Sequence, residues 1–218
     1  MRHLNHISLL FLMFLLQKDI CAQVYTNPIL PTLNDTITIF FQADLGSGGL
    51  ENYDGDIYVH TGLITSESQS SSDWKYVVAD WDENIERLKM QRSSDDPNLY
   101  SLEIGTISEF YSIDNTSNVI KLAMVFRSGD GTLEGKGPNF TDIFIPIIKD
   151  GIHVKFENPL DLNTKIISTK EIIEIKVHSR SLDNPLDRID LIVNDVITGT
   201  TEQENLLYEF SVNTPGFF

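Results

Sequence analysis

The sequence predicts an all-β protein in which one β-sandwich is followed by a second, incomplete one. Short runs of β-branched and aromatic residues recur along the chain, separated by Gly, Pro, Asn, Asp and Ser, which is the pattern of a sandwich. Helical periodicity is almost absent after the first 22 residues. Residues 36–40 alternate strictly, so one face of this strand is expected to be buried and the other wet.

Strands are expected throughout the first half of the chain, interrupted by one short helical turn at residues 107–111. Residues 119–126 are almost continuously apolar, which places this strand centrally in a sheet. The strands expected in this half are 24–26, 36–43, 56–61, 76–78, 87–91, 99–103, 119–127 and 142–147.

Lys149, Asp150 and Gly151 mark a boundary after which a second β unit begins. About four strands are expected there, at 152–157, 171–179, 187–193 and 205–212, with a hairpin turn at Asn194-Asp195. Because a sandwich needs about seven strands, this unit is expected to be incomplete. The chain is thus divided into a leader at 1–22, a first domain at 23–149 and a second domain at 150–218.

The chain is strongly acidic, with 32 Asp and Glu against 16 Lys and Arg and a net charge of −16. Phosphate binding needs a basic surface, so this charge argues against nucleic acid as a partner. It argues equally against anionic membranes and anionic polysaccharides. A neutral ligand or a cation is left open, as is the alternative that acidity only maintains solubility.

The N-terminus is predicted to be a secretory signal peptide. Arg2 and His3 precede an apolar run at residues 7–16, which has the length of a signal core and is too short to span a bilayer. We expect cleavage after Ala22, and therefore a secreted protein with no membrane insertion. The single cysteine, Cys21, would leave with the leader, so no disulfide is expected.

Candidate binding residues gather in and after residues 56–62. This segment reads as a strand followed by a polar loop that carries both tryptophans of the chain, Trp74 and Trp81. Period-two alternation places Tyr58 and His60 on one face of the strand. Flat exposed rings beside polar groups suit a sugar, whose C–H face lies on a ring while its hydroxyls find hydrogen bonds. The alternatives are that the tryptophans close the end of the sandwich and that His60 is structural.

A glycine-rich loop at residues 127–137 follows the central strand and offers Asp130, Glu134 and Lys136 to a ligand edge. It is neither a phosphate-binding loop nor an EF-hand, and the alternative is a plain hairpin loop. Its acidic residues leave Ca²⁺ open, although no cofactor is expected. The histidines are too widely spaced for a zinc site. No pair of catalytic carboxylates and no nucleophile elbow is found.

Several motifs stand in order along the first domain: residues 24–28, 36–41, 55–62, 73–75, 99–102 and 122–127, with Trp81 and Asp130-Gly131. Together they make residues 24–148 resemble the N-terminal β-sandwich of secreted bacterial alpha-amylase-family glycoside hydrolases. That module is similar to starch-binding carbohydrate modules. Residues 150–218 resemble the immunoglobulin-like domain that precedes the catalytic barrel in such enzymes.

The resemblance implies an alpha-1,4-glucan ligand held near Tyr58, His60, Trp74 and Trp81. Lys75 and Asp130 stand in the matching motifs and are further candidates for sugar contact.

The barrel is absent from this chain, so the resemblance implies no hydrolase activity, and the catalytic domain of a parent enzyme would be a partner. The expected function is non-catalytic binding of starch or maltooligosaccharides. The alternative is a structural spacer or docking module that binds no sugar.

Overall fold

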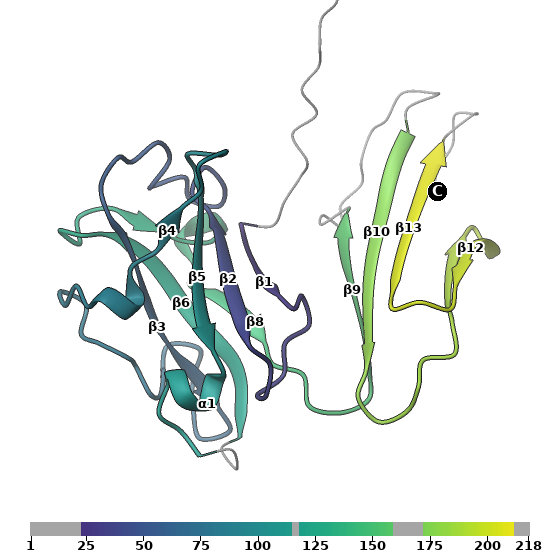
Figure 1. Ribbon diagram of the computed structural model, residues 1–218, viewed down its shortest axis with the longest axis horizontal. Helices are drawn as coiled ribbons and strands as arrows, with labels where there is room; N and C mark the ends of the chain where they lie inside the picture. The colour runs from purple at the N-terminus through teal and green to yellow at the C-terminus, as the bar shows by residue number, and fades with distance from the viewer. Residues whose placement is uncertain (1–22, 115–117, 159–171, 212–218) are drawn as a thin grey trace, which may run out of the picture.

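The computed structural model describes residues 23–114, 118–158 and 172–211 (Figure 1). The all-β prediction is confirmed: these ranges hold thirteen strands, one single-turn α-helix and two 3-10 turns. No helix within them is long and apolar enough to cross a membrane.

Two antiparallel sheets make up the first half. One has the order β1-β2-β5-β4, formed by β1 (Val24–Asn27), β2 (Ile37–Gln42), β5 (Leu99–Gly105) and β4 (Gln91–Arg92). In the other, β3 (Ile57–Thr65) pairs with β6 (Val119–Ser128). The far edge of β6 pairs with β7 (Glu134–Gly135) and β8 (Ile143–Pro146).

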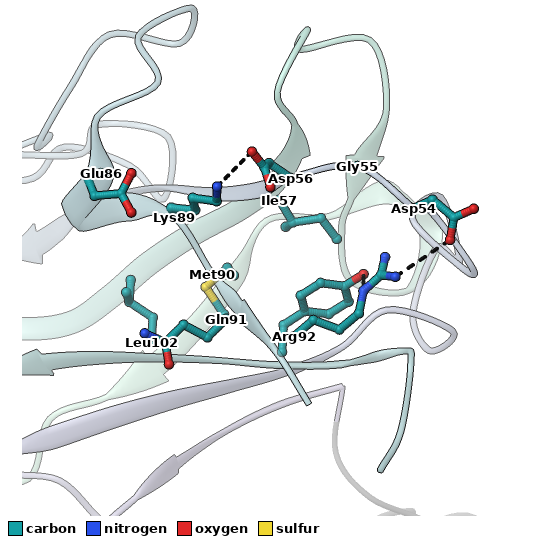
Figure 2. A pocket seen from close by; sticks show the side chains of 11 residues that line it. Asp54, Gly55, Asp56, Ile57, Glu86, Lys89, Met90, Gln91, Arg92 and Leu102 are labelled. Atoms are coloured by element: carbon teal, nitrogen blue, oxygen red, sulfur yellow. Dashed lines mark hydrogen bonds and ion pairs between the residues drawn. The ribbon is translucent and has the colours of Figure 1, made fainter. Parts of the chain in front are cut away.

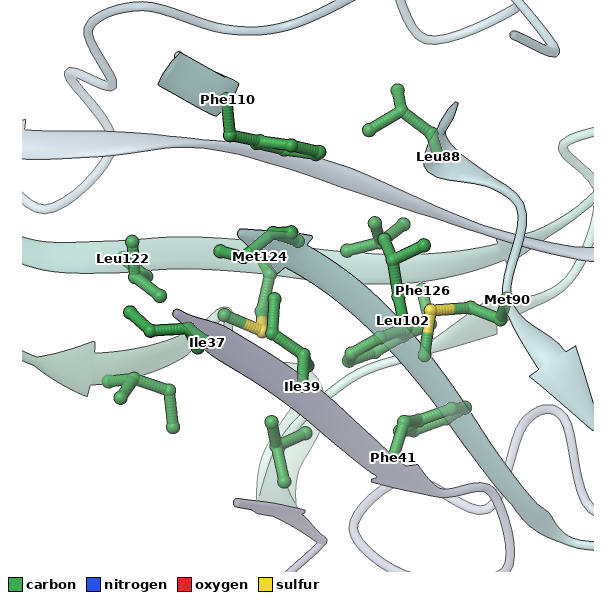
Figure 3. Packing of buried hydrophobic residues seen from close by; sticks show 14 of the residues in the cluster. Ile37, Ile39, Phe41, Leu88, Met90, Leu102, Phe110, Leu122, Met124 and Phe126 are labelled. Atoms are coloured by element: carbon green, nitrogen blue, oxygen red, sulfur yellow. The ribbon is translucent and has the colours of Figure 1, made fainter. Parts of the chain in front are cut away.

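The two sheets pack face to face over a single apolar core. The rings of Phe41 on β2 and Phe126 on β6 stack with centroids 3.8 Å apart, which joins the sheets at the centre of the sandwich (Figure 3). Every second residue of β2, and of β6 from Leu122 to Phe126, points into this core and is buried: Ile37, Ile39, Phe41, Leu122, Met124 and Phe126. Burying one such side chain stabilises the fold by about 1.5–3 kcal/mol.

Two expected strands of this half are not formed. Residues 76–78 lie in a loop, where only Lys75 makes a bridge, to Leu63. Residues 87–91 contain a 3-10 turn, η1 (Glu86–Leu88), followed by β4. The chain is crossing between sheets here, because Met90 N donates to Ile57 O of β3 at 2.8 Å just before β4 joins β5.

The expected helical turn is confirmed as α1 (Ile107–Phe110). Thr106 precedes it and caps it, since its hydroxyl accepts a hydrogen bond from Glu109 N at 3.4 Å.

The second half forms two smaller sheets. One has the order β13-β10-β9, from β9 (Ile152–Asn158), β10 (Ile172–Ser181) and β13 (Asn205–Ser211). The other is a hairpin of β11 (Ile189–Val193) and β12 (Val196–Thr201). The hairpin turn is confirmed, with Asn194 and Asp195 at φ of 50° and 64° as a two-residue primed turn requires. The short strands β7 and β12 were not expected from the sequence.

An ion pair joins the two halves. Both terminal nitrogens of Arg180 on β10 bind the carboxylate of Asp35, at 2.6 and 3.0 Å, and one of them also donates to Leu30 O at 2.9 Å. Nearby, Ile148 N donates to Pro31 O at 2.9 Å. The loop between β1 and β2 is therefore a part of the first half that the second half contacts.

Candidate functional site

The candidate site lies on the face of the β3–β6 sheet that is turned away from the core. Alternation along β3 points Val59 inward and places Tyr58 and His60 together on the other face. Their cross-strand neighbours on β6 are Arg127 and Val125. Of these four side chains, His60 and Val125 line the site and form its floor.

The polar loop after β3 folds back over this floor. Lys75 and Leu63 exchange backbone hydrogen bonds of 2.7 Å in both directions. Gly62 permits the close approach, because a Cβ there would lie 3.0 Å from the carbonyl oxygen of Lys75 and 3.3 Å from the Cβ of Trp74. The absence of a side chain at Gly62 thus allows the loop to bring Trp74 down beside His60.

His60 lies against both tryptophans. Its ring stacks on Trp74 with centroids 5.7 Å apart and planes inclined by 28°, and it meets Trp81 edge-on at 5.2 Å and 69°. Both tryptophans are half-buried, so the expectation of exposed rings is corrected: packing against His60 and the floor covers part of each. The sequence prediction brought these three residues to one site, and the structure does place them together.

Both indole rings are held in place. Trp74 Nε1 donates to Ser71 O at 2.9 Å, which fixes the ring within its own loop. The guanidinium carbon of Arg127 lies 5.8 Å from the centroid of Trp81. Gly131, at a φ of 71°, passes so close that a Cβ would lie 3.2 Å from Trp81 Nε1. Because both rings are already held in place, little free energy of binding would be lost in ordering them around a ligand.

The three rings line a shallow cavity of about 270 Å³, here called the aromatic pocket. Its remaining lining is Ser72, Val125, Glu134, Lys136 and Asp142. Hydroxyl, ammonium and carboxylate groups thus stand around an aromatic wall. The volume lies just below the roughly 300–1,000 Å³ of enclosed small-molecule sites, so the aromatic pocket suits part of a longer ligand.

Charges around the aromatic pocket are largely balanced. Lys136 Nζ lies 3.0 Å from a carboxylate oxygen of Glu134. Burial lowers the pKa of His60 below its ordinary value, and the positive charge of Arg127 acts in the same direction, while Asp142 and Asp80 oppose it. His60 is therefore neutral at pH 7 and presents an uncharged ring.

Tyr58 lies beneath the site rather than in it. It is 8% exposed, and the guanidinium carbon of Arg127 lies 5.3 Å from its ring centroid. Arg127 itself is 2% exposed and donates to Asn84 Oδ1 at 2.8 Å and to Glu83 O at 2.7 Å. Tyr58 and Arg127 thus lie beneath the loop that contains Trp81, and the hydrogen bonds of Arg127 hold this loop in position.

Lys75 and Asp130 make local contacts outside the lining of the aromatic pocket. Lys75 Nζ lies 2.8 Å from Asp73 Oδ1. Asp130 Oδ1 accepts hydrogen bonds from Ser128 Oγ at 2.5 Å and from Thr132 N and Oγ1 at 3.1 and 2.8 Å. These bonds lower the pKa of Asp130 to about 2 and fit the role of a turn-former in the glycine-rich loop.

The sequence did not predict Ser72, Val125 and Asp142 in the lining of the aromatic pocket, or Arg127 as its support. Asp142 comes to the aromatic pocket only because β8 pairs with β6, a long-range contact with no local signal. Arg127 reads as the end of an apolar strand, and its place opposite Tyr58 follows from the β3–β6 register. Glu134 and Lys136, considered from the glycine-rich loop, do line the aromatic pocket.

A larger cavity of about 570 Å³, the crossover groove, lies where residues 89–92 pass between the sheets (Figure 2). Both cations that line it are paired within the chain: Lys89 Nζ lies 2.8 Å from Asp56 Oδ2, and Arg92 pairs with Asp54 at 3.6 Å. The guanidinium of Arg92 also covers the ring of Tyr100, 5.2 Å from its centroid. No aromatic face is left open among these residues, so the smaller aromatic pocket is the stronger candidate.

Within the described ranges, no group of three or more His, Cys, Asp or Glu side chains is arranged to hold a metal ion. No family model matches the sequence, and no curated protein is similar to it at a significant level.

Proposed function

We propose that this protein binds an alpha-glucan, such as starch or a maltooligosaccharide, at the aromatic pocket and without catalysis. The observation that carries the proposal is the His60–Trp74–Trp81 cluster, with rings 5.7 and 5.2 Å apart, bordered by Glu134, Lys136 and Asp142. Ring faces support the C–H face of a sugar, and the polar border offers partners to its hydroxyls.

The charge state of the site favours an uncharged ligand. His60 is neutral at pH 7 because burial lowers its pKa, and Glu134 and Lys136 offset one another. Asp142 adds a negative charge at the border, and the whole chain carries −16. A polyanionic sugar would be repelled, whereas a neutral glucan would not.

Binding is proposed rather than hydrolysis because glycosidic cleavage needs two carboxylates in different roles across the scissile bond. Of the two carboxylates at the aromatic pocket, Glu134 is held by Lys136. The motif resemblance to modules of secreted amylase-type enzymes supports the same proposal, and with it an exported protein and a catalytic domain as partner.

Native gels containing soluble starch, or pectin as a polyanion, test the proposal with the mature chain. We expect retardation by starch alone, and loss of it in Trp74→Ala and Trp81→Ala. One stacked ring contributes about 0.5–1.5 kcal/mol, so the Kd is expected to lie between about micromolar and millimolar.

Tyr25→Ala is the control, since Tyr25 stacks on Phe40 at 4.8 Å in the other sheet. Equal migration of wild type with and without starch would refute glucan binding. Loss of binding in Tyr25→Ala alone would move the site to the other sheet.

A structural spacer is the alternative, and the bidentate Arg180–Asp35 contact between the two halves favours it. A spacer needs a fixed angle between its parts and no ligand. It predicts that the tryptophan variants change nothing in the starch gel, while Arg180 variants alter the shape of the protein in solution.

A further inference from the structure

Phe140 is the most exposed large apolar side chain in the described part of the protein, at 72%. Its backbone has a φ of 59°, in the left-handed region that bulky residues rarely adopt. Among the described non-glycine residues with positive φ, the others are Asn52, Tyr76, Ser112, Asn139, Asn194 and Asp195. Asn and Asp tolerate this conformation well, whereas an exposed phenylalanine gains nothing there from packing.

The loop that carries Phe140 is tightly closed. It contains the 3-10 turn η2 (Pro138–Phe140), and Gly137 N donates to Thr141 O at 2.8 Å across its base. The Thr141 hydroxyl donates to Pro138 O at 3.0 Å. Phe140 is therefore presented on a rigid tip, and its exposure follows from the fold of the loop.

The two ends of this loop line the aromatic pocket. Lys136 precedes Gly137, and Asp142 follows Thr141. Because successive Cα atoms are 3.8 Å apart, the Cα of Phe140 lies within about 7 Å of that of Asp142. Phe140 thus lies two residues from Asp142 at the polar border of the aromatic pocket and is not part of its lining.

We propose that Phe140 is a second contact for the ligand, at an outer subsite that takes the next sugar units of a chain leaving the aromatic pocket. This inference rests on the proposed function and narrows it: the ligand is an oligosaccharide or a polysaccharide, and a single sugar or a disaccharide uses only the aromatic pocket. The small volume of the aromatic pocket, about 270 Å³, fits this division.

Calorimetric titration of the full chain with maltose and with maltoheptaose tests the outer subsite. We expect Phe140→Ala to weaken maltoheptaose binding by about three- to tenfold, the effect of one stacked ring, and to leave maltose binding unchanged. Phe140→Trp should restore maltoheptaose binding. Leu207→Ala, which removes another exposed apolar side chain, at 64%, from the second half of the chain, should change neither.

The variant Phe140→Gly distinguishes the effect of the aromatic ring on binding from the effect of the backbone conformation on stability. Glycine adopts a φ near 59° without strain, so this variant should melt at the wild-type temperature or about 1–3 °C above it and still lose maltoheptaose affinity. A gain in stability with wild-type affinity would assign Phe140 no ligand role.

The outcomes separate the two proposals. If wild type binds neither sugar, the proposed function fails and the outer subsite fails with it. If wild type binds both and Phe140→Ala binds maltoheptaose equally well, only the outer subsite is refuted. Equal weakening for maltose and maltoheptaose would place Phe140 at the first sugar and refute a separate subsite.

Discussion

Arg127 holds its guanidinium carbon 5.8 Å from the ring centroid of Trp81, although the two residues come from different elements. Arg127 belongs to β6, while Trp81 belongs to the loop that crosses above it. The same guanidinium donates to Glu83 O at 2.7 Å and to Asn84 Oδ1 at 2.8 Å. One buried cation thus sets the position of the loop that forms half of the aromatic wall.

Arg127→Met is expected to lower both stability and binding. Methionine keeps much of the length but leaves Glu83 O and Asn84 Oδ1 without their donor, and hydrogen bonds to a charged group contribute about 1.5–3 kcal/mol each. We expect a loss of about 2–4 kcal/mol in urea unfolding and weaker retention by starch. Unchanged starch binding would show that Trp81 keeps its place without Arg127.

His60 is expected to make stability depend on pH. Its folded pKa lies below the ordinary value of about 6.5, so the unfolded chain binds more protons between the two values. The contribution of His60 to the free energy of unfolding is therefore complete above about pH 6.5. It is lost as the pH falls through the pKa of the folded state. His60→Phe keeps a ring but cannot titrate.

The measurement is the difference in unfolding free energy between wild type and His60→Phe from pH 8 to pH 5. Wild type should lose stability relative to the variant as the solution is acidified. A difference that stays constant over this range would contradict the lowered pKa.

Gly62→Ala should displace Trp74. The new Cβ would lie 3.0 Å from Lys75 O and from Val77 Cγ2, and the backbone bonds between Lys75 and Leu63 resist a shift. Overpacking of this kind costs about 1–3 kcal/mol, and starch affinity should fall with it. Gly105→Ala is the matched control, because its φ is 62° but its surroundings are open: it should lose stability and keep full affinity.

The Asp35–Arg180 pair should hold the two halves together above acid pH. Burial raises the pKa of Asp35, but hydrogen bonds from Arg180 and Thr32 outweigh it, and the net pKa lies below its usual value. The contribution of the Asp35–Arg180 pair to the free energy of unfolding is thus present above about pH 4. It is lost as the pH falls through the lowered pKa of Asp35.

Arg180→Gln should cost about 0.5–1.5 kcal/mol at pH 7, reduced by partial exposure of the pair. The cost should shrink below pH 4 in urea unfolding. Arg188→Gln breaks a more exposed pair with Asp190 and should have almost no effect. Equal effects of the two variants would remove any special role for the Arg180 contact.

A chain of residues 23–150 should fold alone. The apolar core of the first half, from Val24 to Ile147, contains no residue from the described part of the second half. Its thermal transition should be cooperative, and the fragment should elute as a monomer. Exposed apolar residues such as Ile152 and Val154 are removed with the second half, so the fragment should also be more soluble. An unfolded fragment would mean that the two halves form one domain.

Local patterns predicted most strands because alternation and turn residues act over a few positions. The strict alternation at 36–40 became β2, and Asn194-Asp195 became a hairpin. Residues 76–78 were misread because β-branched and aromatic residues also occur in a loop that packs on a sheet. There the chain is held by the bridge from Lys75 to Leu63 and by a hydrogen bond from Val78 N to Thr61 O at 3.1 Å, which no local pattern encodes.

The candidate site was predictable where residues are near one another in the sequence or on one strand. His60 and the two tryptophans were grouped from their shared segment. Tyr58 was placed on the correct face but not at the correct depth, since its burial depends on Arg127 from β6. Asp142 reaches the aromatic pocket only through the β6–β8 pairing of the folded chain. The exposure of Phe140 depends on the closed loop before β8.

Both tryptophans of the chain lie in the aromatic pocket, and none lies in the second half. Selectively excited indole fluorescence therefore reports on one surface of one sandwich. Emission shifts during a titration would mark events at the proposed binding surface, without labels. During denaturation the same signal would follow the first half only, so a mismatch with far-ultraviolet circular dichroism would reveal separate melting of the second half.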